Sequence, residues 1–143
     1  MASELERAIA EVHAGTATEL ILEEQEINAA GATQLADALR TNTSVKELHL
    51  HDNSIGEAGA TQLADALRIN TSVEKLWLGF NSIGAEGATQ LADALSTNTS
   101  VEKLNLVFNS IGAELVGRIE ACSTRRRGRS ARPTSRGGGG ARC

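Results

Sequence analysis

Residues 31–39 read GATQLADAL, and the same nine letters return at residues 59–67 and 87–95. The copies are offset by 28 residues each time, with no insertion or deletion between them. A fixed period of this length indicates a solenoid, in which each repeat is one supersecondary unit stacked on the next. Within the nine residues the leucines lie four apart and alanines fill the same side, which is the spacing of a helix.

Each helical segment follows a shorter segment that has the spacing of a strand. Four such segments share a pattern in which two leucines stand two apart, followed by Asn and then Ile, with Gln in place of Asn in the first copy. The paired leucines point to one face, because side chains alternate along a strand. We expect the leucines and isoleucines of all repeats to form one continuous core, since a single repeat cannot bury its own apolar face.

This pattern resembles the leucine-rich repeat of the ribonuclease-inhibitor-like class over about residues 17–113. The resemblance implies an α/β solenoid, a horseshoe fragment with parallel strands on its concave face and helices on its convex face. We divide the chain into a capping helix within residues 1–16, a repeat domain at 17–122 and a disordered Arg/Gly-rich tail at 123–143. The repeat domain holds three full repeats and a partial fourth that closes the array.

Two sets of asparagines repeat with the same period. The first set stands where the chain leaves each strand, and its stacked amides are expected to bridge neighbouring repeats. The second set follows the last helical leucine, where we expect left-handed residues that end the helices. The first set is Asn53, Asn81 and Asn109, and the second is Asn42, Asn70 and Asn98.

The charge is divided unevenly along the chain. Residues 1–122 hold all 18 acidic residues, whereas residues 123–143 hold seven of the 14 basic residues, all of them arginine. An acidic body with a basic tail leaves open a tail that binds RNA or an acidic partner, or one that directs nuclear import. The arginines on which these hypotheses mainly depend are Arg125, Arg126, Arg127 and Arg129.

Several classes of function lack support in the sequence. No apolar run approaches the roughly 20 residues that span a membrane, and acidic residues stand where a secretory signal would be apolar. Cys122 and Cys143 lack the spacing of a disulfide framework, so we expect reduced thiols in a cytoplasmic protein, with a nuclear location as the alternative. No catalytic motif or phosphate-binding loop is present, so we expect neither an enzyme, nor a cofactor, nor a small-molecule substrate.

The residues that alternate with the strand leucines should face the concave surface, and they differ most between repeats. Scaffold positions are held by packing, whereas these positions are free to suit a partner. Glu19 and Gly79 also belong to these alternating positions. The candidate partner-binding residues among them are Ile21, Glu23, Glu47, His49, His51, Lys75, Trp77, Lys103, Asn105 and Val107.

Trp77 has two interpretations, as an anchor for a partner or as a ring that lies flat over neighbouring strand side chains. Phe80 and Phe108 are expected to pack against each other at the loop edge.

His49, His51 and Glu23 are the residues closest to a zinc site, because imidazole and carboxylate groups both bind zinc. Two histidines without a firm third ligand are a weak signal, so we expect no metal.

These observations favour a non-catalytic interaction module that binds a protein or peptide through its concave strand face. The resemblance also extends to Ran GTPase-activating proteins and to the sensor arrays of NOD-like receptors, which implies a regulatory role as an alternative. RNA or acidic-partner binding by the tail is a third hypothesis. Four strands span only about 15 Å, so the chain is either part of a longer array or a binder of a peptide or loop.

Overall fold

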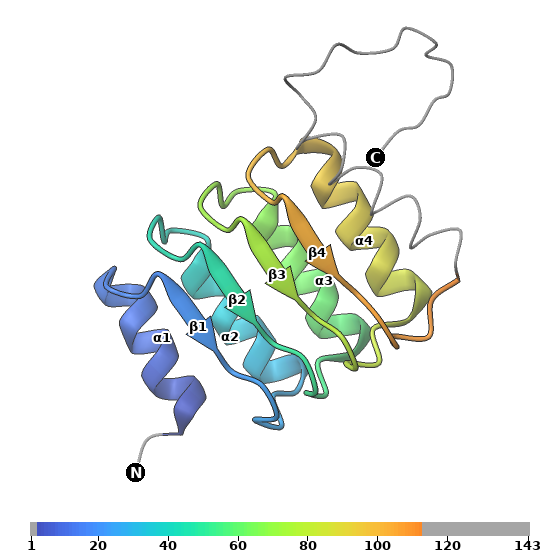
Figure 1. Cartoon of the computed structure of the whole chain (residues 1–143), viewed down its shortest axis with the longest axis horizontal. Coiled ribbons are helices and arrows are strands. Elements are labelled where there is room, and N and C mark those ends of the chain that lie inside the picture. The colour runs from blue at the N-terminus through green and yellow to red at the C-terminus, as the bar shows by residue number, and fades with distance from the viewer. Residues whose placement is uncertain (1–2, 113–143) are drawn as a thin grey trace, which may run out of the picture.

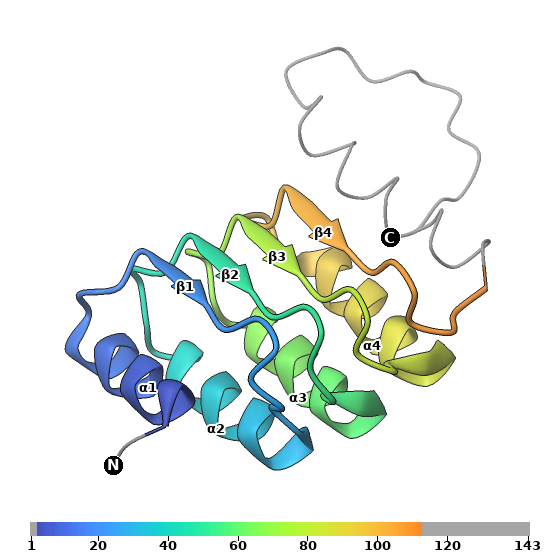
Figure 2. The same cartoon turned by 60° about the horizontal axis from the view of Figure 1, so that its bottom comes forward.

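The computed structural model describes residues 3–112, in which strands and helices alternate along a solenoid (Figure 1). In chain order the elements are α1 (Glu4–Ala14), β1 (Glu19–Ile21), α2 (Ala29–Leu39), β2 (Glu47–His49), α3 (Gly56–Leu67), β3 (Lys75–Trp77), α4 (Gly84–Thr97) and β4 (Lys103–Asn105). The strands form one parallel sheet in the order β1-β2-β3-β4. The helices lie in a second layer on one side of it (Figure 2). The expected α/β solenoid is confirmed.

The repeat period sets how the strands pair. Each strand residue lies opposite the residue 28 positions further along the chain, so equivalent positions form straight rows across the sheet. The middle row is buried and consists of Leu20, Leu48, Leu76 and Leu104. Because side chains alternate along a strand, the neighbouring rows face away from the helices.

The core is aliphatic and runs through every repeat. The second repeat contributes Val45, Leu48, Leu50, Ile55 and Leu63, each at most 2% exposed, and the neighbouring repeats contribute the equivalent residues. All of these residues belong to one continuous cluster. Stacking therefore buries the apolar face that a single repeat would leave in water.

The first asparagine set forms a buried ladder where the chain leaves the strands. The Nδ2 group of Asn81 donates to the carbonyl of Leu50 in the preceding repeat (2.8 Å) and to that of Leu78 in its own repeat (3.1 Å). Its Oδ1 accepts from the backbone N–H of Ile55. Asn53 and Asn109 repeat this pattern of bonds. These amides satisfy backbone groups that no longer have sheet partners.

The second asparagine set does not end the helices in the left-handed conformation, so that expectation was wrong. Asn98 has φ −74° and ψ 134°, and neither Asn42 nor Asn70 has a positive φ. The side chains instead form a second buried ladder. Asn70 donates to the carbonyls of Leu39 and Asn42 in the preceding repeat, and its Oδ1 accepts from two N–H groups that lead into β3. The amide thus links the carbonyl groups at the end of α2 with the start of β3 in the following repeat.

Glycines allow the helices to pack closely against each other. A Cβ atom at Gly87 would lie 2.6 Å from Cγ2 of Ile83 and 3.0 Å from Cβ of Ala60 on the neighbouring helix. Gly59 is in the same position one repeat earlier. The expected role of both glycines in close packing is confirmed.

Helix α1 takes the position that a repeat helix would occupy at the N-terminal end. Ser3 accepts a hydrogen bond from the N–H of Glu6, and Gly15 ends the helix at φ 72°. Asn42 donates to the carbonyl of Val12 on α1, as Asn70 does to that of Leu39 on α2. We interpret α1 as the cap of the array, because it supplies the same hydrogen-bond acceptor and apolar contacts as a repeat.

Several expectations concern residues outside the described range. They are the closing helix after residue 112, the thiols Cys122 and Cys143, and the tail with Arg125, Arg126, Arg127 and Arg129. Within residues 3–112, no helix is both long enough and apolar enough to cross a membrane.

Candidate binding surface on the strand face

The ten candidate partner-binding residues gather on the exposed side of the sheet, opposite the helices. We call this surface the strand face. Its exposed members are Ile21, Lys75, Lys103 and Val107, and its half-buried members are Glu23, Glu47, His49, His51, Trp77 and Asn105. The strand register brings residues together that lie 28 positions apart in the sequence.

The charge of the first row of the strand face changes from negative to positive across the sheet. Glu19 and Glu47 lie opposite each other on β1 and β2, and Lys75 and Lys103 continue the row on β3 and β4. Lys75 Nζ lies 3.2 Å from Glu47 Oε1, which joins the two halves. The pKa of the Glu47 carboxyl lies below its ordinary value, first because of hydrogen bonding with Glu19 and then because of Lys75. One end of the strand face is therefore acidic and the other basic.

The second row contains the aromatic centre of the surface. The rings of His49 and Trp77 stack with their centroids 4.2 Å apart and an interplanar angle of 12°. Lys103 Nζ lies 5.8 Å from the centroid of the Trp77 ring, within reach of a cation–π interaction. The indole therefore lies flat against a neighbouring side chain, as the second interpretation of Trp77 describes. It remains half-buried, so part of its surface is available to a partner.

A carboxylate joins the two strand-face histidines. Glu23 Oε1 lies 3.2 Å from His51 Nε2 and 3.6 Å from His49 Nδ1. On the other side of its ring, His49 Nε2 lies 3.9 Å from Glu19 Oε1 and 4.0 Å from Glu47 Oε2. The structure thus places His49 between three carboxylates.

The three residues whose ligand atoms come closest together are not the set His49, His51 and Glu23 that the sequence suggested. The described residues place the ligand atoms of Glu19, Glu47 and His49 within 4.8 Å of one another. The sequence pattern groups His49 with His51 and Glu23 instead, because these residues share one strand face and adjacent repeats. The pairing of Glu19 with Glu47 follows from the strand register. It could have been predicted from the sequence, because the two residues are one repeat period apart.

A hollow of about 230 Å³ opens beside Trp77. Its lining residues are His51, Asp52, Trp77, Gly79, Phe80, Asn105 and Val107. Phe80 and Phe108 stack at its edge with centroids 4.5 Å apart, which confirms that they pack against each other. Their exposed fractions are 47% and 75%, so this edge is apolar and open to solvent.

Asp52 and Phe80 were not among the candidate binding residues, although both line the hollow. They belong to loops that follow the strands and have positive φ angles of 61° and 56°. A left-handed backbone is uncommon for residues other than glycine. The alternation of a strand therefore did not predict the direction of these side chains.

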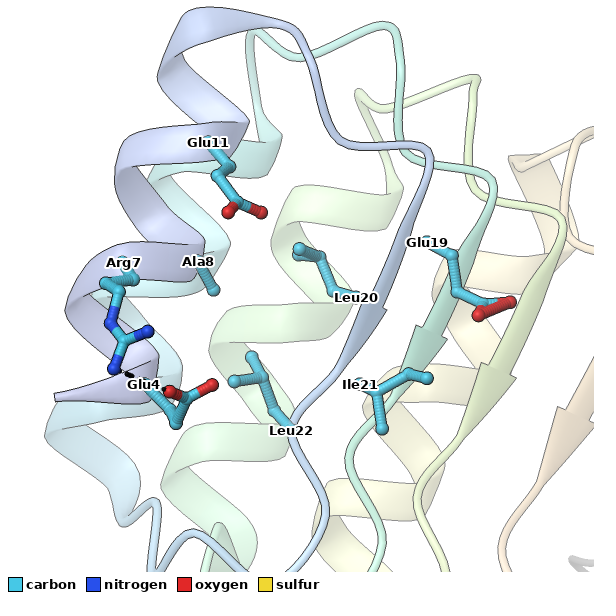
Figure 3. Close-up of a pocket in the computed structure, with 8 residues that line it drawn as sticks. All are labelled: Glu4, Arg7, Ala8, Glu11, Glu19, Leu20, Ile21 and Leu22. Atoms are coloured by element: carbon cyan, nitrogen blue, oxygen red, sulfur yellow. Dashed lines mark ion pairs between the residues drawn. The ribbon is translucent and has the colours of Figure 1, made fainter.

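A smaller hollow of about 120 Å³ lies between α1 and β1 (Figure 3). Arg7 pairs with Glu4 at 3.0 Å, within the helix. The close-up shows the carboxylate of Glu19 directed away from α1 and toward β2 (Figure 3). Glu19 thus lines this hollow and also belongs to the first row of the strand face.

A parallel sheet backed by helices, with a fixed period and buried asparagine ladders, defines a repeat solenoid that exposes one strand face. The family model described as Leucine Rich repeat matches residues 41–64, 70–92 and 97–114. The chain therefore contains leucine-rich repeats within residues 41–114. Leucine-rich repeat domains are generally non-catalytic modules that bind proteins, and no enzyme family is indicated.

Two solved structures share the fold. One is described as "Leiomodin-1 Actin-Binding Site 2 (ABS2)"; it is 22% identical, has a TM-score of 0.74, and the match covers 85% of this chain and 73% of that one. The other is a Caenorhabditis elegans tropomodulin C-terminal domain; it is 12% identical, has a TM-score of 0.59, and the match covers 90% and 96% of the two chains. At these identities the likeness shows the fold alone. Comparison with curated protein sequences gave no match. The assignment to the ribonuclease-inhibitor-like class stays a prediction.

Proposed function

We propose that the chain is a non-catalytic interaction module and that its strand face binds a segment of a protein partner. One observation carries this proposal. The positions that differ most between near-identical repeats come together on a single exposed surface. A scaffold that repeats its core and varies one face is suited to recognition, because changes on that face leave the packing intact.

The hollow beside Trp77 gives this surface a place for an apolar side chain. Half-buried tryptophans next to a pocket are typical of the few residues that dominate binding energy. The stack on His49 holds the indole in one orientation, so less side-chain entropy is lost when a partner binds. The stacked phenylalanines extend the apolar area at the edge of the hollow.

The charge division sets the direction in which a partner segment would lie. Glu19, Glu23 and Glu47 favour basic groups at the β1 end, whereas Lys75 and Lys103 favour acidic groups at the β4 end. Four strands span about 15 Å, which is small beside a standard interface of roughly 800 Å² per partner. A peptide or loop with an apolar residue between basic and acidic ends fits this surface best.

Replacing Trp77 tests this proposal. Trp77→Ala should weaken binding of a captured partner by about 2 kcal/mol, or roughly thirtyfold in Kd, because it removes the wall of the hollow. The measurement is affinity capture with the whole chain, followed by titration of the purified partner. Ile69→Ala is the matched control, because Ile69 is also a large apolar side chain, 55% exposed, that lies outside the strand face.

Actin is a defined protein to include in the titration, because the leiomodin-1 structure that shares this fold is described as an actin-binding site. Binding of actin that is weakened by Trp77→Ala and unchanged by Ile69→Ala would support the proposal and supply the partner. If Trp77→Ala leaves the binding of every captured protein unchanged, the strand-face proposal is wrong.

A further inference from the structure

Two carboxylates meet on the strand face with only one lysine to compensate them among the described residues. Glu19 and Glu47 are register partners on neighbouring strands and lie within hydrogen-bonding reach of each other, whereas two charged carboxylates in this position repel each other. Lys75 lies 3.2 Å from Oε1 of Glu47. The other oxygen of Glu47, Oε2, faces His49, as does Oε1 of Glu19. One oxygen of each carboxylate is therefore directed at the same imidazole.

The imidazole nitrogen that faces these oxygens has no hydrogen-bond partner within the described part of the chain. Nε2 of His49 is shielded from solvent and lies 3.9 and 4.0 Å from the two carboxylate oxygens, too far for a hydrogen bond. A protonated Nε2 would lack an acceptor at bonding distance, and an unprotonated Nε2 would face only acceptors. A buried polar atom in this position is costly in either state. A cation between the three side chains would satisfy all of them.

The surroundings of His49 hold its ring in a direction suited to ligation. Its Nδ1 atom faces Glu23 at 3.6 Å, and its ring is stacked on Trp77. Ligand histidines in proteins usually direct the second ring nitrogen at a carboxylate, which fixes the tautomer that leaves the first nitrogen free to bind metal. Glu23 lies on the Nδ1 side of the ring, and its carboxylate would have to move a few tenths of an ångström closer to form that hydrogen bond.

We propose that Glu19, Glu47 and His49 bind a divalent transition-metal ion of the zinc type. Their ligand atoms lie within 4.8 Å of one another, and zinc binds such atoms at about 2.0–2.2 Å. Small rotations of the two glutamate side chains, which are 46% and 28% exposed, would bring them to that distance. The imidazole ligand favours zinc over magnesium or calcium, which prefer oxygen ligands alone. A remaining position of the ion would face solvent.

The proposed site differs from the expectation from the sequence that no metal binds. That expectation considered His49 with His51 and Glu23, whereas the strand register brings Glu19 and Glu47 to the opposite nitrogen. The metal site does not depend on the proposed protein partner, because ion binding is measured on the chain alone.

Isothermal titration with zinc tests the proposal, with absorption spectra of the cobalt(II) form as a second readout. The protein is the whole chain with Cys122→Ser and Cys143→Ser, because thiols also bind zinc. We expect one ion per chain, and about tenfold weaker binding or worse in His49→Gln and in Glu47→Gln. Magnesium in place of zinc should give no binding.

His13→Gln is the matched control, because it removes an exposed imidazole in the last turn of α1, outside the three ligands and outside the strand face. Its affinity for zinc should equal that of the parent chain. Circular dichroism shows that each variant keeps the fold. The proposal is overturned if the parent chain binds no zinc at millimolar concentration. It is also overturned if His49→Gln binds as well as the parent chain, or if only His13→Gln loses binding.

Discussion

Asn81 shows what a single repeated residue contributes to this fold. Its side chain is fully buried and connects the carbonyls of Leu50 and Leu78 in two successive repeats. The sequence predicted this role, because an amide at the strand exit offers both donors and an acceptor. The same reasoning failed for Asn70, where the residue type suggested a left-handed backbone and the structure uses the side chain instead.

Asn81→Ala should lower the free energy of unfolding by about 3 kcal/mol, because it leaves buried backbone groups without partners. Chemical denaturation monitored by circular dichroism measures the change. The matched variant is Asn105→Ala on the strand face, where Asn105 accepts one exposed hydrogen bond from the N–H of Val107. We expect less than about 1 kcal/mol for that variant. Equal effects in the two variants would show that the ladder does not stabilise the stack.

The strand-face side chains are where residue-level prediction reached its limit. Alternation along each strand predicted which residues would be exposed, and the repeat period predicted which would be neighbours. It left two interpretations of Trp77 open, one of them a ring flat over its neighbours as in the stack on His49, and it did not predict the hollow next to that ring. These features depend on rotamers and on loop residues with positive φ angles, such as Phe80, and neither follows from a periodic pattern.

At the scale of elements, the helices and strands followed from the repeats because every copy carries the same periodicity. A strand of three residues, such as β3, would be a weak signal alone. Four aligned copies made it a strong one. The helix packing was also predictable, since a Cβ at Gly87 would lie only 3.0 Å from Cβ of Ala60 on α3 and glycine has none.

Gly87→Ala should destabilise the protein by about 1–3 kcal/mol, because the new methyl group would overlap Ile83 within the core. Thermal and chemical unfolding measure this change. Gly31→Ala is the matched variant. At Gly31 the new Cβ would lie 2.9 Å from the end of the flexible Leu5 side chain of α1 and 3.1 Å from Cγ2 of Ile27, which is less close than the 2.6 Å to Ile83 at Gly87. The gain in helix propensity offsets much of that contact, so we expect a smaller effect. A larger loss at Gly31 than at Gly87 would contradict this account of the packing.

At the scale of the whole molecule, the fold separates stability from recognition. The helices and the leucine core repeat almost without change, and they hold an exposed sheet whose rows differ from strand to strand. Helix α1 takes the place of a repeat helix at the N-terminal end of the described stack. The strand face is left as the surface that combines an aromatic centre, a hollow and a division of charge.

Photo-crosslinking from two positions tests the central claim most directly, namely that the strand face is the surface that meets a partner. A benzophenone amino acid replaces Asn105 on the strand face in one variant and Glu86 on α4 in another; both sites are at least partly accessible to solvent. The account predicts that the partner crosslinks to position 105 and not to position 86. Crosslinking from position 86 alone would contradict it, because the partner would then bind the helix side of the solenoid.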